Sequence, residues 1–297
     1  MADTDRADAH AAAEWTVGSV LRWATQDFAQ RGLTNPRLDA ELLLAAALGV
    51  DRIRLIIDSK RLLEPGELSA YRASIRRRRA GEPVAYILGE REFFGLPIHV
   101  DARVLIPRPD TEILVEAALT RTAERCMYGR ALDLCTGSGC VAIAFAKARP
   151  TWRITALDVS AAALGVAQSN ALRAGSIWGV RFVQGDLFAG LAAAERFELI
   201  TANPPYVPSA EVDGLDPGIR DFEPRLALDG GEDGLTLVRR ILEEAPGRLV
   251  PKGLLAMEIG AGQSGRVREL FAGAGLVEIE LHRDYGGHER VVSGRKA

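Results

Sequence analysis

The segment Asn203-Pro204-Pro205-Tyr206 is the part of the sequence that most directly suggests a reaction. The two prolines fix φ and hold the residue before each of them in extended geometry, so the Asn203 amide and the Pro204 carbonyl become a rigid pair of acceptors. The lone pair of an amide or exocyclic amine is delocalised, and two acceptors that take its N–H groups can turn that lone pair toward an electrophilic methyl. The Tyr206 ring can pack on a flat substrate and make a cation–π contact. These four candidate catalytic residues predict methyl transfer to a planar nitrogen; the alternative is a plain proline turn.

A glycine turn after an apolar segment predicts a nucleoside-binding loop. Two glycines permit a tight strand-to-helix turn and a close approach of backbone to ligand. The candidate cofactor-binding residues of this loop are Asp133, Cys135, Thr136, Gly137, Ser138 and Gly139. The same glycines, with Asp158 further along, also fit the fingerprint of NAD-binding proteins. The loop alone leaves both cofactors open, and a turn that serves only packing is a third alternative.

Acidic residues near the ends of three predicted strands help to decide which cofactor the loop binds. Asp158 is placed to accept hydrogen bonds from ribose hydroxyls, and Asp186 from an adenine amine, although either could instead cap a helix. Asp133 directly precedes the loop, where a carboxylate favours a positive group such as an α-ammonium over a pyrophosphate. NAD would also leave residues 203–206 unexplained. Together these positions predict S-adenosylmethionine as the cofactor.

These residues can form one site only if the fold brings the ends of their strands together. The sequence pattern beyond residue 110 predicts such a fold. Helical and strand periodicity alternate there, which predicts a mostly parallel sheet with helices on both faces. Ligands of such sheets bind at the carboxyl ends of strands, beside the switch in strand order. We expect helices at 111–125, 140–148, 161–174, 235–248 and 264–274, strands at 131–134, 153–158, 180–184, 198–202 and 253–259, and two more strands at the C-terminal end.

The first part of the chain has a different pattern. Apolar residues recur at helical spacing from residue 17, and we expect helices at 17–28, from Pro36 to near Gly49, at 52–58 and at 66–79. Four arginines at 76–79 favour a solvated last helical turn over a docking patch for an acidic partner. Residues 83–100 contain the short extended runs AYILG and EFFGLPIHV, with turns at Gly89 and Gly95, which predict a hairpin linker.

The composition is that of an ordinary globular protein. The chain has 297 residues, enough for two domains, and its 47% hydrophobic and 26% charged residues argue against disorder, a fibrous repeat or a disulfide scaffold. The formal net charge of −3 provides no global field for a polyanion. Cys126, Cys135 and Cys140 lack C-x-x-C spacing, so they predict neither a metal site nor a disulfide framework and indicate a reducing compartment. The acidic start has no apolar signal core and no apolar run approaches a membrane span, so we expect a cytoplasmic protein without membrane contact.

Several stretches resemble one family of enzymes. NPPY after the fourth strand resembles amino-group methyltransferases, and EPVAYILGEREFFGLPIHVDARVLIPRPDTE at 82–112, DLCTGSG at 133–139 and DFEPRLALDGGEDGL at 221–235 resemble the bacterial release-factor glutamine methyltransferases (HemK/PrmC). The resemblance covers residues 15–294. It implies a Rossmann-like class I methyltransferase fold, α/β and mostly parallel with a C-terminal antiparallel strand, joined by a β-hairpin to a small N-terminal helical domain. The implied ranges are a disordered 1–14, a substrate-docking helical domain at 15–81, the hairpin linker at 82–109 and the methyltransferase domain at 110–297.

Carried over by position, the family's cofactor site falls on residues 135–139, Asp158, Leu187 after Asp186, and Asn203, and the substrate glutamine is held by residues 203–206. Two positions depart from the family. Cys135 stands where the family usually has glycine, and we expect its small thiol to fit the turn if φ is negative. Leu187 stands where some members have tryptophan against the adenine, and it offers a smaller apolar surface.

The resemblance implies transfer of a methyl group from S-adenosylmethionine to the side-chain amide nitrogen (N5) of the glutamine in the Gly-Gly-Gln loop of peptide-chain release factors, with S-adenosylhomocysteine as product. An adenine-N6 or guanine-N2 nucleic-acid methyltransferase is the alternative, because the same acceptors fit an exocyclic amine. Residues 1–80 carry 13 basic and 11 acidic side chains, too small an excess for a nucleic-acid domain, so we expect no stable nucleic-acid binding. A cofactor-binding interaction module is a third alternative, but it would not need the NPPY acceptors.

Overall fold

The computed structural model describes residues 15–125 and 127–297. It divides the chain into two compact units, the first ending at Leu88 and the second running from Gly89 to Ala297. The expected disordered segment 1–14 and Cys126 lie outside the described residues. No helix in the described part of the chain combines the length and apolar character needed to cross a membrane.

The first unit is helical, in agreement with the sequence pattern. Thr16 caps the first helix through a reciprocal pair of hydrogen bonds with Ser19, and Gly49 ends the second helix in a left-handed conformation. Phe28, Leu43 and other fully buried apolar side chains form the core between the helices. The helices are α1 (Val17–Gln30), α2 (Pro36–Leu48), α3 (Arg52–Ile57), α4 (Pro65–Arg79) and α5 (Val84–Leu88).

The arginines at the end of α4 are only in part the solvated turn that we expected, since Arg76 and Arg77 are exposed whereas Arg78 and Arg79 are partly buried. Arg78 is only 13% exposed in its side chain, because acidic residues of the same unit face this turn. Three of the four arginines are bound within the unit in this way: Arg77 to Glu82, Arg78 to Asp39 and Arg79 to Asp27. These arginines therefore stabilise the helical unit itself.

The expected extended run AYILG is helical, which corrects the sequence interpretation. The carbonyl of Pro83 accepts hydrogen bonds from the backbone N–H groups of Tyr86 and Ile87, and this turn places Val84 and Ile87 together on the core of the first unit. The predicted hairpin is present after it, between β1 (Glu90–Phe93) and β2 (Leu96–His99). Its turn has positive φ at both Phe94 and Gly95, which matches the twist of the two strands.

The hairpin belongs to the second unit. The backbone N–H of His99 donates to Asn170 Oδ1, and Asn170 Nδ2 donates to the His99 carbonyl, both at 2.9 Å. Asn170 lies on α8 (Ala161–Arg173) and is 1% exposed, so one buried amide attaches β2 to the helices of this unit.

A seven-stranded sheet forms the centre of the second unit, and it confirms the predicted fold class. The strand order is β5-β4-β3-β6-β7-β9-β8. Only β9 pairs antiparallel with its neighbours, and the other four pairings are parallel. The order turns back between β3 and β6, so the chain leaves a crevice at their carboxyl ends. The strands are β3 (Arg130–Leu134), β4 (Arg153–Asp158), β5 (Val180–Gln184), β6 (Phe197–Ala202), β7 (Leu249–Glu258), β8 (Leu276–Arg283) and β9 (Glu289–Lys296).

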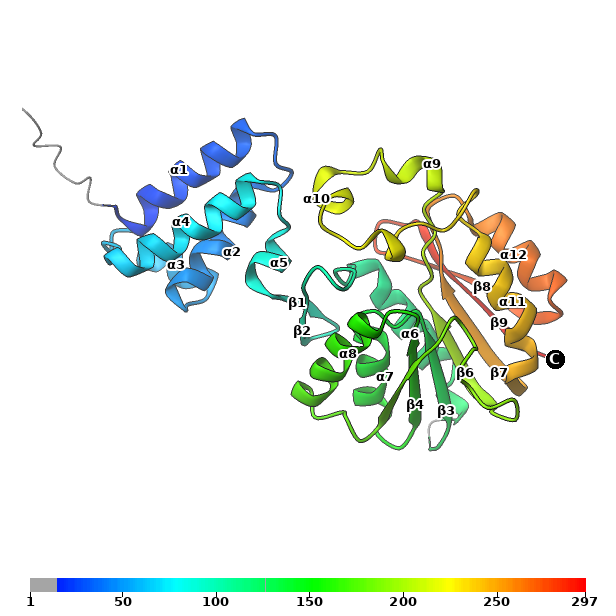
Figure 1. The fold of residues 1–297 in the computed structure, drawn as a ribbon. Coiled ribbons are helices and arrows are strands. Elements are labelled where there is room, and N and C mark those ends of the chain that lie inside the picture. Colours follow the sequence, from blue (N-terminus) through cyan, green and yellow to red (C-terminus); the bar gives the residue numbers. More distant parts are fainter. Residues whose placement is uncertain (1–14, 126) are drawn as a thin grey trace, which may run out of the picture. The chain divides into compact units, whose positions relative to one another are not determined.

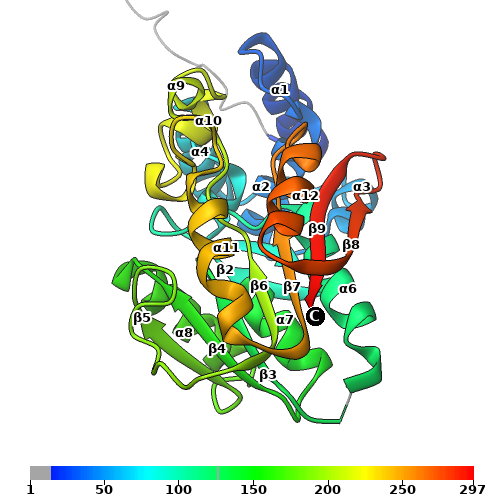
Figure 2. The same ribbon diagram turned by 90° about the vertical axis from the view of Figure 1, so that its right-hand side faces the viewer.

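Helices cover both faces of this sheet (Figures 1 and 2). On one face, α6 (Glu112–Arg121) and α7 (Cys140–Ala148) bury apolar side chains such as Ala118 and Phe145 against β3, β4 and β6. On the other face, Ile241 of α11 (Thr236–Arg248) and Phe271 of α12 (Ser264–Gly273) pack on Ile200 and Leu255 of the sheet. Both faces are dry, which holds the strand ends in fixed positions.

The remaining elements are short and connect the strands at the carboxyl edge. The predicted helix 111–125 is divided into the single turn η1 (Pro109–Thr111), α6 and η2 (Ala123–Arg125). Between β6 and α11 the chain forms the short helices α9 (Ser209–Val212) and α10 (Pro217–Arg220) and the turn η3 (Arg225–Ala227), none of which the periodicity predicted.

Candidate active site

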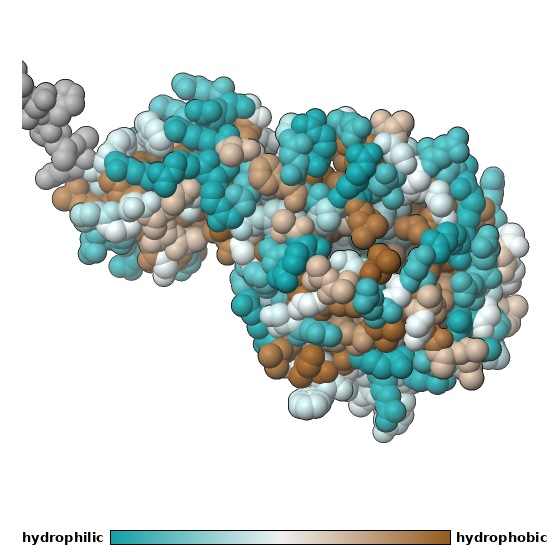
Figure 3. Space-filling model, in the orientation of Figure 1, coloured by the Kyte–Doolittle hydropathy of each residue, from teal (hydrophilic) through white to brown (hydrophobic). Residues whose placement is uncertain are grey.

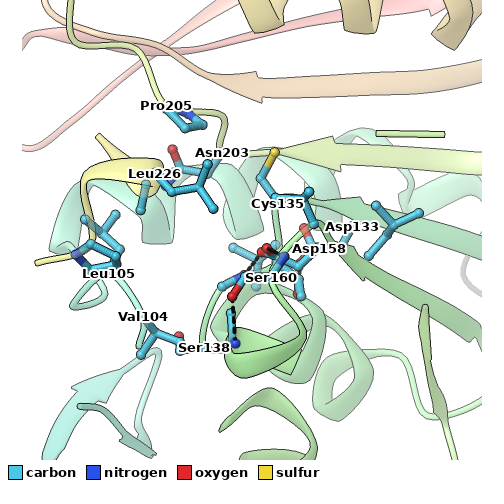
Figure 4. Close-up of a pocket in the computed structure, with 18 of the residues that line it drawn as sticks. Val104, Leu105, Asp133, Cys135, Ser138, Asp158, Ser160, Asn203, Pro205 and Leu226 are labelled. Atoms are coloured by element: carbon cyan, nitrogen blue, oxygen red, sulfur yellow. Dashed lines mark hydrogen bonds between the residues drawn. The ribbon is translucent and has the colours of Figure 1, made fainter. Parts of the chain in front are cut away.

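A cavity of about 320 Å³ lies at the carboxyl ends of β3, β4 and β6. In Figure 3 the surface of the second unit is hollowed, and hydrophobic side chains gather around the hollow. Nearly all of the predicted cofactor residues line the cavity: Asp133, Cys135, Thr136, Gly137, Ser138, Asp158, Asp186, Leu187 and Asn203. Pro205 also lines it, whereas Gly139, Pro204 and Tyr206 do not. Two positions far apart in the sequence, Asn203 and Asp158, thus face one space (Figure 4).

The loop after β3 has a backbone that suits glycine. Gly137 and Gly139 have φ of +54° and +80°, and a Cβ at Gly139 would come within 3.0 Å of the Ala167 Cβ. Gly139 therefore allows α7 to begin against α8 and shapes the loop without touching the cavity. Cys135 has φ of +56°, so the negative φ that an unstrained fit of its side chain requires is not present. The cysteine occupies a left-handed conformation that its Cβ disfavours and that glycine would adopt without this strain.

Asp158 at the end of β4 is held in one orientation by two backbone groups. The N–H of Gly137 donates to Oδ2 at 2.8 Å, and the N–H of Ser160 donates to Oδ1 at 2.9 Å. Ser160, not Asp158, caps α8 through the N–H of Ala163, so the helix-cap alternative for Asp158 does not apply. Burial raises the pKa of Asp158, while these backbone N–H groups lower it. Each carboxylate oxygen keeps a second lone pair that can accept from a hydroxyl.

Asp133 is 3% exposed and lies at the bottom of the cavity. The hydroxyls of Thr136 and Thr201 donate to its two oxygens at 2.6 and 2.7 Å. Burial raises the pKa of Asp133 to about 6, against the effect of these two hydroxyls. A buried carboxylate with a raised pKa gains most from a cationic ligand, because a nearby positive charge stabilises its ionised form.

Asp186 and Leu187 both line the cavity but differ in burial. Asp186 is exposed and accepts a hydrogen bond from Arg240 Nη2 at 2.9 Å, whereas Leu187 is 5% exposed and packs in the core. Leu187 has φ of +52°, so the backbone turns sharply at this position. Asp186 is thus bound to an arginine that the sequence interpretation had not included.

The predicted catalytic segment follows β6 directly and is fixed from three sides. Asn203 Nδ2 donates to Thr111 Oγ1 at 3.3 Å. The carbonyl of Tyr206 accepts from Gln263 Nε2 at 3.0 Å. Gly234, with φ of +73°, approaches so closely that a Cβ there would lie 2.3 Å from the Tyr206 carbonyl oxygen. The segment 221–235, which carried part of the family resemblance, thus supports the backbone of residues 203–206.

Tyr206 lies beside this network and remains a neutral phenol near neutral pH. Burial raises its pKa to about 12, and the nearby Glu258 adds to this rise. Its ring is therefore available for packing and cation–π contact, and its hydroxyl is not a general base.

A roof of two segments closes one side of the cavity. Arg108 Nη2 lies 2.5 Å from Glu223 Oε1, and the backbone N–H of Ile106 donates to Glu223 Oε2 at 3.1 Å. Burial raises the pKa of Glu223, while Arg108 lowers it. Val104 and Leu105 belong to the segment that contains Ile106 and Arg108, and they lie on one side of the cavity (Figure 4). Leu226 belongs to the segment that contains Glu223, and it lies beside Asn203 (Figure 4). The sequence interpretation assigned no role to either segment.

Glu258, the last residue of β7, is a further site residue that the sequence interpretation missed. It is 2% exposed, and its Oε2 has no hydrogen-bond partner among the described residues. Burial raises the pKa of Glu258 to about 7, and the neighbouring Thr111 and Asn203 side chains counteract that rise. A signal was present in the sequence, because this glutamate is the penultimate residue of the predicted strand 253–259, near the same sheet edge as Asp133 and Asp158.

The residues present fit S-adenosylmethionine. Asp158 faces the cavity with fixed acceptors for ribose hydroxyls, Asp133 is a buried anion for an ammonium group, and Leu187 provides apolar surface. The Asn203 amide stands at the same cavity with its nitrogen end bound to Thr111. The arrangement therefore combines a nucleoside site with a fixed amide acceptor.

Comparison with known proteins agrees with this geometry. The family pattern of the PrmC N-terminal domain matches residues 19–89, and that of the methyltransferase small domain matches residues 109–214. A release factor glutamine methyltransferase of Geobacter sulfurreducens is 43% identical over 95% of this chain and 97% of its own length. Another of Rhodopirellula baltica is 41% identical over 95% of this chain and 97% of its own.

Solved methyltransferase structures resemble the fold of this chain over about three quarters of its length. The hMettl16 catalytic domain in complex with the MAT2A 3'UTR hairpin 6 has a TM-score of 0.57 at 17% identity, and the match covers 74% of this chain and 82% of that chain. A methyltransferase of Pyrococcus furiosus has a TM-score of 0.51 at 20% identity, covering 77% of this chain and 99% of its own. At these identities the likeness concerns the fold alone.

Proposed function

Because this chain belongs to the release factor glutamine methyltransferase family, we propose that residues 203–206 and the adjoining cavity carry out the reaction of that family. The protein is an S-adenosylmethionine-dependent methyltransferase that modifies the side-chain amide of a glutamine in release factors. The observation that carries the proposal for the site is the Asn203 amide, held by Thr111 at a cavity that the Asp158 carboxylate also faces.

The cofactor residues are proposed on the contacts described above. Asp158 binds the ribose hydroxyls, Asp133 faces the ammonium group, and Asp186 with Leu187 borders the adenine. Residues 135–138 contact the cofactor through their backbone, and Gly139 shapes the turn of this loop. When bound, S-adenosylmethionine supplies an electrophilic methyl group on a sulfonium.

Two hydrogen-bond acceptors of the protein orient the substrate amide for the transfer. Asn203 Oδ1 and the Pro204 carbonyl each take one N–H of the substrate amide, which fixes the nitrogen with its lone pair toward the methyl donor. Pro205 keeps the Pro204 carbonyl in place through its restriction of the preceding residue, and the Tyr206 ring packs beside the reacting groups. Orientation and fixed dipoles then provide most of the rate enhancement, and the nitrogen loses its proton after the transfer.

The helical unit is proposed as the docking domain for the release factor. The range 15–81 carries none of the cofactor residues, and its helix α3 exposes Ile53, Ile56 and Ile57 at 66–70% of their surface. Neighbouring exposed isoleucines are unusual on a surface without a partner and fit an apolar face of a protein substrate.

Methyl-transfer assays with labelled cofactor test the proposal against its alternative. Purified release factor with a Gly-Gly-Gln loop should accept one methyl, and adenine- or guanine-containing DNA and RNA should accept none. The relatives at about 40% identity do not favour nucleic acid as substrate. Methylation of nucleic acid with an unmodified release factor would overturn the proposal.

A further inference from the structure

Asn203 can serve as an acceptor for the substrate only if its amide is turned the right way. A side-chain amide has an accepting oxygen and a donating nitrogen of almost the same shape, so its orientation depends on its partners. Nδ2 donates to Thr111 Oγ1 at 3.3 Å, which leaves Oδ1 for the substrate. Thr111 is 2% exposed, and this contact is therefore shielded from water.

A threonine hydroxyl alone cannot decide that orientation. A hydroxyl both donates and accepts, so Thr111 could equally donate to Oδ1 of a flipped Asn203 amide. The flipped amide would present two N–H groups to the substrate nitrogen, which has no acceptor to offer them. Some third group must therefore fix the direction of the Thr111 hydroxyl.

Glu258 is the group in the right place. It lies within interaction distance of both Thr111 and Asn203, and it is buried with Oε2 lacking a hydrogen-bond partner among the described residues. An ionised carboxylate only accepts, so it takes the Thr111 O–H. The Thr111 oxygen can then only accept, and the group that it accepts from is Asn203 Nδ2. The second N–H of Nδ2 is also free to approach the carboxylate.

We propose that Glu258, acting through Thr111, is a positioning residue that keeps the Asn203 amide turned with its oxygen toward the substrate. This inference rests on the proposed function of Asn203 and extends it to Thr111, which also lines the cavity, and to Glu258, which does not. Glu258 does not line the cofactor cavity, so its effect reaches the reaction through Asn203.

The test uses the full-length protein and its release factor substrate, with single-turnover rates and cofactor affinity measured separately. Glu258→Gln introduces a side chain that can donate to Thr111, and Thr111→Val removes the hydroxyl with little change in shape. Each variant should transfer methyl at least about tenfold more slowly, because a preorganised polar group has lost its orientation, while cofactor affinity stays within about twofold. Thr111→Ser keeps the hydroxyl and should restore most of the rate.

A double-mutant cycle distinguishes positioning from general damage to the fold. In the Asn203→Ala background the Glu258→Gln and Thr111→Val changes should have almost no further effect, because their target is gone. Additive losses, an undiminished rate in Thr111→Val, or a Thr111→Ser variant as slow as Thr111→Val would overturn the positioning role. A wild-type protein that does not methylate the release factor would instead overturn the proposed function, so the two failures are distinguishable.

The pH profile provides a readout that a purely structural role would not change. Protonated Glu258 can donate to Thr111 and so permits the flipped amide; the wild-type rate should therefore rise as Glu258 loses its proton, and this limb should vanish in Glu258→Gln. The other charged or titratable groups that interact with Glu258 are Asp110, Arg290, Tyr206 and Cys140, and all four are unchanged in the variant. Asp133, whose pKa burial raises to about 6, titrates in both proteins, so the result that would contradict the role is a limb near pH 7 that is as large in Glu258→Gln as in the wild type.

Discussion

The Asp158 carboxylate accepts a 2.8 Å hydrogen bond from the backbone N–H of Gly137, which fixes the acid at the end of β4 to the loop after β3. Two segments of the nucleoside site thus hold each other before any ligand arrives. Such an arrangement limits the entropy lost when the cofactor binds. It also explains why a single carboxylate can have a large effect on affinity.

Asp158→Ala should weaken S-adenosylmethionine binding by about 1.5–3 kcal/mol, the range for hydrogen bonds to a charged group. Calorimetry on the full chain measures this directly. Asp186→Ala is the matched control, because Asp186 is exposed and already paired with Arg240, and it should lose less. Equal losses in the two variants, or none in Asp158→Ala, would contradict the proposed ribose contact.

Cys135→Gly should stabilise the protein by about 1 kcal/mol, since the left-handed conformation at φ of +56° is disfavoured by a Cβ. Cys135→Ala keeps the Cβ and removes the sulfur, so it should show no such gain. Urea unfolding of the three proteins provides the comparison, with a higher midpoint and an unchanged slope expected for the glycine variant. A gain that appears equally in Cys135→Ala would point to the thiol instead of the backbone.

Glu258 should make the stability of the protein depend on pH in the acid range. Its folded pKa is raised to about 7 from an ordinary value of 4.5, so the folded state binds the proton more tightly than the unfolded state. The stability due to this group is present in full below the ordinary value and is lost as pH rises to about 7. Between pH 4.5 and 7 the wild type should therefore lose up to about 3 kcal/mol of unfolding free energy relative to Glu258→Gln.

Denaturant titrations of both proteins at several pH values between 4.5 and 7 would measure that shift, because other titrating groups are common to the two proteins. A constant difference would show that Glu258 titrates normally in the folded state.

Ile53→Ser combined with Ile57→Ser should impair docking of the release factor. Burial of an isoleucine contributes about 1.5–3 kcal/mol, so the KM for intact release factor should rise at least about tenfold. Cofactor affinity and the rate with a short Gly-Gly-Gln peptide should not change. Leu172→Ser, at a residue of α8 that is 66% exposed, is the control and should leave all three unaffected. An unchanged KM in the double variant would remove support for docking through α3.

The strands and most helices of the second unit were predictable because their patterns are local. The elements 140–148, 153–158 and 180–184 agree with the sequence to the residue, since glycine, proline or an acid lies at or near their ends and marks their bounds. The helix at 84–88 was not predictable in this way, because five residues are too few to show periodicity and packing on the first unit decides their conformation.

The site was partly predictable for a related reason. Asp133, Asp158 and Asn203 end strands, and the alternation of strands and helices already places strand ends together. Leu226 comes from the connection between β6 and α11, whose path depends on tertiary contacts such as the pairing of Arg108 with Glu223. Arg240 lies on the predicted helix 235–248, but its contact with Asp186 depends on how that helix packs on the sheet. The positive φ of Cys135 could not be predicted from the sequence, because hydrogen bonds between this loop and β4 determine the conformation of the loop.

The central claim is that the Asn203 amide orients a glutamine amide of the release factor for methylation. Asn203→Ala should reduce methyl transfer by about 10²–10³, as removal of one preorganised polar group does, while cofactor still binds. Changing the loop glutamine of the release factor to asparagine shortens the side chain by one methylene. The amide then falls about 1 Å or more short of the acceptors, and misplacement of that size costs about 10²-fold.

Mass spectrometry of the Gly-Gly-Gln peptide, after incubation of intact release factor with S-adenosylmethionine and the protein, measures this outcome most directly. The account predicts one added methyl on the glutamine side chain with the wild-type protein, almost none with Asn203→Ala, and none on the asparagine-containing release factor. An unmodified glutamine under conditions where adenine in DNA or RNA becomes methylated would contradict it.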